Sequence, residues 1–130
     1  MIYSLAVYGP PYTYQASDTA FHFAEALLAK GHELHRVFFY HDGVYNGTRL
    51  SVPPQDEINI PARWSELAGK HEVDLVICVA SALRRGVLNA TEAERYELDS
   101  DNMGTAFNLS GLGQLIDAGI HSDRLITFGA

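Results

Sequence analysis

The sequence has little cysteine, little positive charge and no long apolar run. Cys78 is the only cysteine among 130 residues, which excludes an internal disulfide, a paired-cysteine redox site and a zinc knuckle built from several thiolates. No apolar run approaches the roughly 18 residues of a membrane helix, and we expect no membrane contact. Lys and Arg number 9 against 16 Asp and Glu, for a net charge of -7, so direct nucleic-acid binding is not expected. The first residues lack the basic region of a secretion signal, which favours a cytoplasmic location.

The order of apolar and amphipathic stretches predicts an α/β protein. Residues 74–78 begin a near-continuous apolar run, which is typical of a strand buried on both faces of a parallel sheet. Strands that alternate with helices imply βαβ units. We therefore predict a three-layer α/β/α sandwich with a mostly parallel central sheet and flavodoxin-like topology, in a single domain over residues 1–130. The expected strands are residues 2–8, 34–40, 74–78 and 124–128, with a further one indicated at 106–109.

Helices are predicted between these strands. Residues 15–30 place small and apolar side chains on one helical face and end before Gly31, a residue that commonly stops a helix. Thr91 and Glu94 have the spacing of a capping box at the start of a short polar helix. The buried face of the second helix is expected to comprise Ile60, Trp64, Leu67 and Ala68. The last helix is expected to open at Ser110-Gly111-Leu112-Gly113, with Leu112, Leu115 and Ile116 buried.

Cys78 lies where its predicted strand gives way to a turn that contains Arg84 and Arg85. In a parallel sheet, ligands and chemistry collect at the carboxyl ends of the strands. A thiol at that place would be favoured as thiolate by the start of the next helix and by the two arginines. The residues alone allow a reactive, sulfur-handling cysteine or a packed core cysteine, and the usual burial of free cysteines favours the second.

His41 ends the second predicted strand at the same sheet edge as Cys78, so we expect His41 and Asp42 to border the same pocket. The segment from His41 to Glu57 is the longest irregular piece and is rich in turn residues. A loop of this length in a compact domain is usually functional or part of an interface.

No cofactor and no metal are expected. Residues 9–14 contain two prolines and two tyrosines, which are too bulky to cradle the phosphate of FMN, and no G-x-G-x-x-G follows any strand. Residues 110–113 are a weak anion site, better explained as a helix start. His32 and His35 are expected on opposite faces of a strand, so these two and His41 are interpreted as solvated or packed. No G-x-S-x-G motif is present, and acyl transfer by Cys78 with a histidine base stays open without support from any spacing.

The segment Cys78-Val79-Ala80-Ser81-Ala82-Leu83-Arg84-Arg85-Gly86 resembles the cysteine motif of the DsrE/TusD family of sulfur-relay proteins. Several blocks in the same order are more specific than one cysteine motif, and they favour a reactive Cys78 over a packed one. The further matching blocks are residues 37–44, 46–50, 110–115 and 122–125.

The resemblance implies a cytoplasmic sulfurtransferase subunit with an α/β/α fold. Such subunits assemble with two smaller related proteins into a dimer of heterotrimers. The cysteine that matches Cys78 accepts sulfane sulfur as a persulfide from an upstream TusA-type donor and passes it to a DsrC/TusE-type acceptor. The sulfur is destined for 2-thiolation of the tRNA wobble uridine or for dissimilatory sulfur oxidation.

Thiol chemistry agrees with this expectation. Persulfide exchange requires a thiolate and a site that is open to a protein donor. A lone cysteine cannot resolve its own persulfide, so the sulfur must leave on another protein's thiol. Arg84, Arg85 and His41 are the candidate supporting residues; the arginines would stabilise the anion, or pair with acidic partners, or cap a helix. The alternatives are a structural subunit of the same complex in which Cys78 only packs, and a flavodoxin-like domain that binds a small ligand.

Overall fold

The computed structural model describes residues 1–129 and contains a five-stranded sheet in the order β4-β3-β2-β1-β5. Every neighbouring pair of strands is parallel. Within the described residues, no helix has both the length and the apolar character that crossing a membrane requires. The strands are β1 (Ile2–Val7), β2 (Glu33–Phe39), β3 (Asp74–Cys78), β4 (Phe107–Ser110) and β5 (Arg124–Phe128). The helices are α1 (Ala16–Ala29), the 3-10 helix η1 (His41–Gly47), α2 (Ile60–His71), α3 (Val79–Arg84), α4 (Ala90–Arg95) and α5 (Gly113–Ile120).

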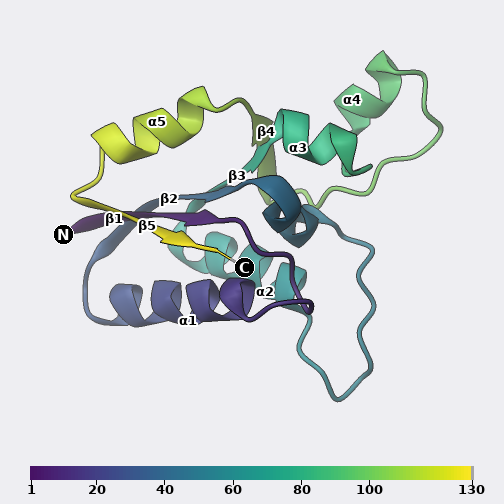
Figure 1. Ribbon diagram of the computed structural model, residues 1–130. Helices are drawn as coiled ribbons and strands as arrows, with labels where there is room; N and C mark the ends of the chain where they lie inside the picture. Colours follow the sequence, from purple (N-terminus) through teal and green to yellow (C-terminus); the bar gives the residue numbers. More distant parts are fainter. Residues whose placement is uncertain (130) are drawn as a thin grey trace.

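Helices cover both faces of the sheet (Figure 1). α1 and α2 lie together against one face, and α5 lies across the other. α3 and α4 extend beyond the carboxyl end of β3, to the right of α5 in Figure 1. The predicted three-layer fold with a parallel sheet is therefore confirmed. The strand order differs from the 2-1-3-4-5 order of flavodoxins, because β1 lies between β2 and β5 instead of between β2 and β3.

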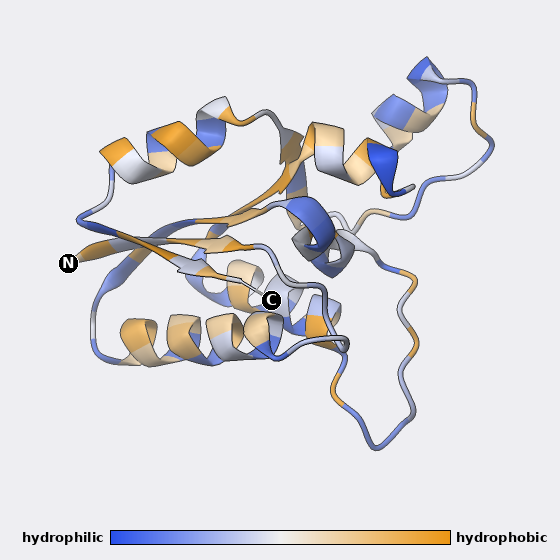
Figure 2. Cartoon of the chain, in the orientation of Figure 1, coloured by the Kyte–Doolittle hydropathy of each residue, from blue (hydrophilic) through white to orange (hydrophobic). Residues whose placement is uncertain are grey.

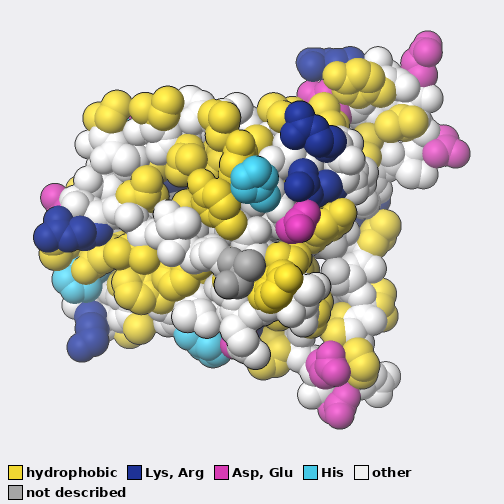
Figure 3. Space-filling model, viewed as in Figure 1, with side chains coloured by type: hydrophobic (Ala, Val, Ile, Leu, Met, Phe, Trp, Pro, Cys, Tyr) yellow, Lys and Arg dark blue, Asp and Glu magenta, His cyan; other side chains and the backbone are white. Residues whose placement is uncertain are grey.

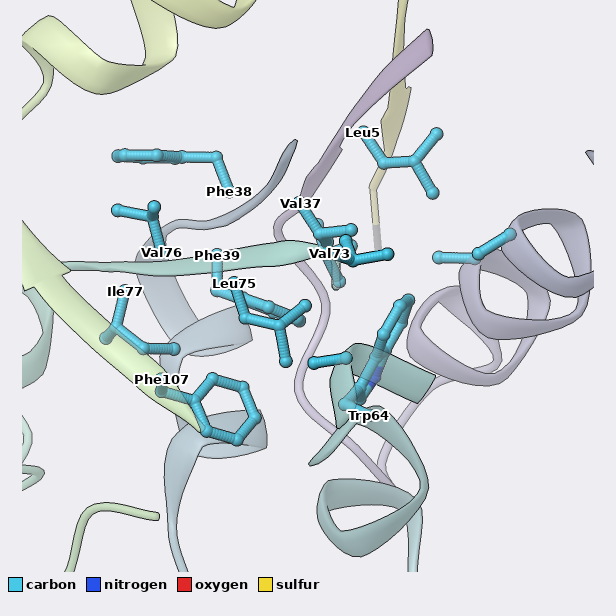
Figure 4. Close-up of a cluster of buried hydrophobic side chains, with 14 of the residues drawn as sticks. Leu5, Val37, Phe38, Phe39, Trp64, Val73, Leu75, Val76, Ile77 and Phe107 are labelled. Atoms are coloured by element: carbon cyan, nitrogen blue, oxygen red, sulfur yellow. The ribbon is translucent and has the colours of Figure 1, made fainter. Parts of the chain in front are cut away.

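Buried hydrophobic side chains fill the space between the sheet and the α1–α2 layer (Figure 4). Leu75 and Ile77 point from β3 toward this layer, whereas Val76 points to the side of α5. The two-residue period of a strand produces this alternation, and all three side chains are buried. Trp64 of α2 is fully buried and packs edge-on against Phe39, with ring centroids 5.3 Å apart.

Asparagine side chains begin α2 and α4. The Asn59 side chain accepts a hydrogen bond from the Ala62 N–H, and the Asn89 side chain accepts one from the Glu92 N–H. Each satisfies a backbone donor that the first helical turn leaves without a partner. The predicted cap at Thr91 is therefore wrong, because Asn89 occupies the N-cap of α4.

The last helix starts later and is less buried than predicted. Ser110 ends β4, and α5 begins only at Gly113. Leu112 and Ile116 are 47% and 66% exposed, so the prediction that these two side chains are buried is wrong. Leu115 is half-buried and packs against the core. Only the inner side of α5 contacts the sheet, and within residues 1–129 no other element covers its outer side (Figure 2). The exposed apolar side chains of this surface, the α5 patch, are Leu112, Ile116, Ile120 and Leu125.

Candidate functional site at the carboxyl end of β3

Cys78 is the last residue of β3 and the N-cap of α3. It is paired in register with Ser110, the last residue of β4. Since Phe39 is paired with Ile77, Tyr40 follows β2 directly beside Cys78. The prediction that the thiol lies at the carboxyl end of a strand is confirmed. The unpartnered N–H groups of the first turn of α3 begin immediately after it.

The Cys78 side chain is only 2% exposed. Strand alternation puts it on the same side of the sheet as Val76, opposite to the α1–α2 layer. In this chain by itself, the thiol is therefore closed to a protein donor, contrary to the expectation of an open site. Access requires movement of the elements around the junction of β3 and α3.

Four residues fasten η1 to α3, and we call this group the latch. The backbone N–H of His41 donates to Ser81 Oγ at 3.2 Å. The Arg85 guanidinium donates from Nε to Asp42 Oδ1 at 2.7 Å and from Nη1 to the Ser81 carbonyl at 3.1 Å. Sequence reasoning identified His41, Asp42 and Arg85 as neighbours of the site but missed Ser81, whose small polar side chain in an apolar segment is its only indication.

The His41 imidazole points away from the latch. Its ring packs against the rings of Tyr40 and Tyr8, with centroid distances of 4.1 and 5.5 Å. Tyr8 follows β1, which lies on the far side of β2 from the strand of Cys78. His41 also has a φ of +49°, a left-handed backbone that is uncommon outside glycine. Its contact with α3 is thus made by the backbone and not by the ring.

The two arginines have different surroundings. Arg85 is held in the latch, whereas Arg84 is exposed and forms no ion pair within residues 1–129. Both lie at the end of α3 opposite to Cys78, and six residues of helix rise correspond to about 9 Å. Side chains of both charges and a histidine gather over this part of the surface, near the centre of Figure 3. Arg84 is therefore the cation of this pair that remains available to an incoming protein.

A second set of contacts fixes η1 against α1 and the end of β1. The Asn46 amide donates to Ser17 Oγ and to the Gly43 carbonyl, each at 2.9 Å, and Ser17 Oγ donates to the Gly9 carbonyl at 2.7 Å. A side chain at Gly43 would collide with the carbonyl of Val7, so only glycine allows this close approach. These contacts join η1 to the end of β1 and to α1, so η1 is anchored independently of the latch.

The whole chain matches known proteins. The model of the DsrE/DsrF-like family matches residues 1–128. The chain belongs to this family. A protein of Allochromatium vinosum that carries the name sulfurtransferase DsrE is 54% identical over 129 residues, covering 99% of each chain. Proteins named sulfurtransferase TusD homolog are 49% identical in Pseudomonas aeruginosa, covering 99% of this chain and 98% of that one, and 46% identical in Aliivibrio fischeri, covering 98% of each.

The fold also matches that of a solved structure. The crystal structure of the YchN protein from E. coli superposes with a TM-score of 0.79 at 20% identity, covering 98% of this chain and 99% of that one. The family model and the curated relatives confirm the resemblance to the DsrE/TusD family. The names of full-length relatives support the predicted transferase class.

In this member of the DsrE/DsrF-like family, Tyr12 in the turn after β1 holds the backbone that leads into α2. The Tyr12 hydroxyl donates to the Ile58 carbonyl at 2.9 Å and accepts from the Ile60 N–H at 3.0 Å. It thereby fixes the end of the long loop at the start of α2.

The histidines singled out in the sequence lie apart. His32 contacts the N-terminal amine at 3.1 Å, and His35 lies near the start of β2. His41 follows the other end of that strand, about 20 Å away along an extended backbone. The three therefore form no common site, and His35 has other partners, described below.

Proposed function

We propose that this chain is a sulfurtransferase of a sulfur relay and that Cys78 carries the transferred sulfur as a persulfide. The observation that carries the proposal is the placement of the chain's only thiol at the carboxyl end of β3, at the N-cap of α3. The names of the full-length relatives support the activity. The upstream donor would be a TusA-type protein and the acceptor a DsrC/TusE-type protein, with tRNA thiolation or sulfur oxidation as the destination.

The exchange needs no redox partner. The Cys78 thiolate attacks the terminal sulfur of a donor persulfide, R–S–SH. The S–S bond of the donor breaks, the new bond gives Cys78–S–SH, and the donor leaves as a thiolate that takes up a proton. In the second transfer an acceptor thiolate attacks the terminal sulfur of Cys78–S–SH and regenerates Cys78. Because no second cysteine exists in the chain, the persulfide persists until that acceptor arrives.

The buried thiol requires an opening step. Cys78 joins β3 to α3, so a displacement of α3 from η1 would expose the sulfur with the least disturbance of the sheet. In this proposal Arg85 and the His41 backbone are positioning groups that hold α3 closed through the latch. Arg84, exposed at the end of α3, would meet an acidic surface of the donor or acceptor.

We propose further that the working form is a complex with two related smaller subunits, arranged as a dimer of heterotrimers. The α5 patch supports assembly, because four large apolar side chains on one surface are exposed by 40% to 73%. With a net charge of -7, the chain offers no electrostatic basis for direct tRNA binding.

Sulfur acceptance by Cys78 variants tests the proposal. Wild type, Cys78→Ser and Cys78→Ala are mixed with a persulfidated donor, with and without the partner subunits, and intact masses are measured. We expect one added sulfur on the wild type and none on either variant. Because the site is buried, Cys78→Ser should also lower stability, by about 1–3 kcal/mol for an unpaired hydroxyl. Cys78→Ala removes the nucleophile without that hydroxyl and controls for the loss of stability.

A structural subunit is the second candidate, and the 2% exposure of Cys78 is the observation that favours it. If the chain is only a structural subunit, the wild type will gain no sulfur even when the partner subunits are present. Both variants will then still assemble with those subunits. Equal labelling of the wild type and the variants would also remove Cys78 from the mechanism. A flavodoxin-like ligand domain is disfavoured by the strand order and by the role of Tyr12.

A further inference from the structure

A β-bulge turns His35 toward α5. In the pairing of β1 with β2, Tyr3 is opposite Leu34 and Ser4 is opposite Arg36, so His35 is the extra residue on β2. Such a bulge breaks the alternation of side chains and re-aims one of them. His35 and its neighbour Arg36 consequently both contact α5, although adjacent strand residues normally face opposite sides.

His35 meets two residues from the end of α5. Its Nε2 is buried, makes no hydrogen bond within the described residues, and lies 3.7 Å from Asp117 Oδ2. His121 follows Asp117 by one helical turn, and its Nδ1 lies 2.9 Å from Asp117 Oδ1 and 3.0 Å from the Asp117 backbone carbonyl oxygen. One nitrogen of each imidazole and one carboxylate oxygen lie within 4.8 Å of one another.

Arg36 fixes the carboxylate of this group from the other side. Its guanidinium donates to Asp117 Oδ2 at 2.8 Å and to Asp74 Oδ2 at 2.7 Å. Asp117 Oδ1 is left facing the imidazole of His121. With both imidazoles neutral, the two carboxylates outweigh the one guanidinium, and the group carries net negative charge.

We propose that His35, Asp117 and His121 form a binding site for a divalent transition-metal ion of the Zn²⁺ type. Two imidazoles and one carboxylate are a ligand set that suits Zn²⁺, Co²⁺ and Ni²⁺ and leaves a position for water or an outside ligand. Tetrahedral ligands at about 2.0–2.2 Å from zinc are about 3.4 Å apart. The separations of 3.7 Å from His35 Nε2 to Asp117 Oδ2 and 2.9 Å from His121 Nδ1 to Asp117 Oδ1 lie on either side of this value.

Arg36 acts as an outer partner that orients the ligating carboxylate, as hydrogen-bonded neighbours of metal ligands commonly do. The site lies where the end of α5 approaches the beginning of β2, at the left in Figure 1. Cys78 lies at the opposite, carboxyl edge of the sheet. Metal binding is thus independent of the sulfur chemistry proposed above.

His22 provides a matched control within the chain. It is exposed on α1 and also has two carboxylates nearby, Asp18 at 3.5 Å and Glu25 at 3.6 Å. These carboxylates approach opposite nitrogens of its ring, so the three groups cannot converge on one ion. A histidine with acidic neighbours but without a shared centre is therefore available for comparison.

The test is metal titration of the full chain without a polyhistidine tag, after treatment with a chelator. Zn²⁺ binding is measured by calorimetry and Co²⁺ binding by visible absorption, for the wild type and for His35→Gln, His121→Gln, His22→Gln and Cys78→Ser. We expect one ion per wild-type chain and Co²⁺ bands of nitrogen and oxygen ligation. His35→Gln and His121→Gln should each weaken binding at least tenfold, whereas His22→Gln and Cys78→Ser should bind as the wild type does.

Three outcomes would overturn the site. The wild type would bind no metal ion, or His22→Gln and His35→Gln would weaken metal binding equally. The third is a thiolate-to-cobalt absorption band in the wild type that is absent in Cys78→Ser. His121 is exposed at the end of α5, so His121→Gln is expected to fold. This variant therefore tests the site even if His35→Gln fails to fold. A rise in the melting temperature on adding Zn²⁺, absent in His121→Gln, is the second readout.

Discussion

At the scale of single residues, the buried thiol of Cys78 determines how sulfur can enter. Alkylation by iodoacetamide should be at least about a hundredfold slower in the folded chain than in urea, since it requires a local opening that costs about 2.7 kcal/mol or more.

Arg85→Gln removes the ion pair with Asp42. A partly exposed pair contributes about 0.5–1 kcal/mol, so this variant should react about two- to fivefold faster. Mass spectrometry of timed samples measures both rates.

Arg84→Gln is the control for this prediction. It removes a neighbouring charge of the same kind, but Arg84 forms no ion pair within residues 1–129, and its alkylation rate should equal that of the wild type. Equal acceleration by both variants would mean that net charge, and not the latch, controls access to Cys78.

At the scale of elements, one charged group holds α5 to the sheet. A hydrogen bond from Arg36 lowers the pKa of Asp117 below its ordinary value, against the opposing effect of desolvation. A carboxylate with a lowered pKa in the folded state adds stability above its unfolded pKa of about 3.9, and this stability is lost as pH falls through the folded pKa. Asp117→Asn should therefore be less stable than the wild type at neutral pH, with a difference that shrinks below about pH 4.

Urea unfolding at a series of pH values, with a chelator present to exclude metal effects, measures this difference. Asp56→Asn is the matched control, because Asp56 is exposed in the loop before α2 and forms no ion pair within the described residues. The stabilising role of the ion pair between Arg36 and Asp117 would be disproved if the stability deficit of Asp117→Asn stayed constant from neutral to acidic pH, or if Asp56→Asn showed an equal deficit.

At the scale of the whole molecule, the α5 patch is the surface on which assembly should depend. Ile116 and Ile120 are 66% and 73% exposed, and a buried charge at either position would be costly. The double variant Ile116→Glu/Ile120→Glu should remain folded as a single chain but lose its place in the complex. Light scattering of material co-expressed with the related subunits measures the mass. Ala26→Glu, on the exposed side of α1, is the control and should assemble normally. If the double variant also assembles, the α5 patch is not the surface that contacts the related subunits.

The sequence by itself determined the features that depend on local pattern. Buried strands such as Val37-Phe38-Phe39 and the apolar face around Trp64 follow from side-chain periods of two and 3.6 residues, which neighbours along the chain establish. The same reasoning placed Cys78 at the end of its strand, because the apolar run gives way there to small residues and then to two arginines and a glycine. The turn predicted directly after Cys78 is instead the helix α3. The family motif around it consists of consecutive residues and is visible without a structure.

Only the tertiary structure decided which distant residues meet. The pair of Asp42 with Arg85 and the closure of Cys78 depend on how η1 docks on α3, which no local pattern encodes. The exposure of Ile116 depends on the absence of a covering element within the described chain. His35 reaches Asp117 and His121 because one extra residue in β2 reverses its direction, and a bulge arises from the pairing of two strands, which is a property of the sheet and not of either strand alone.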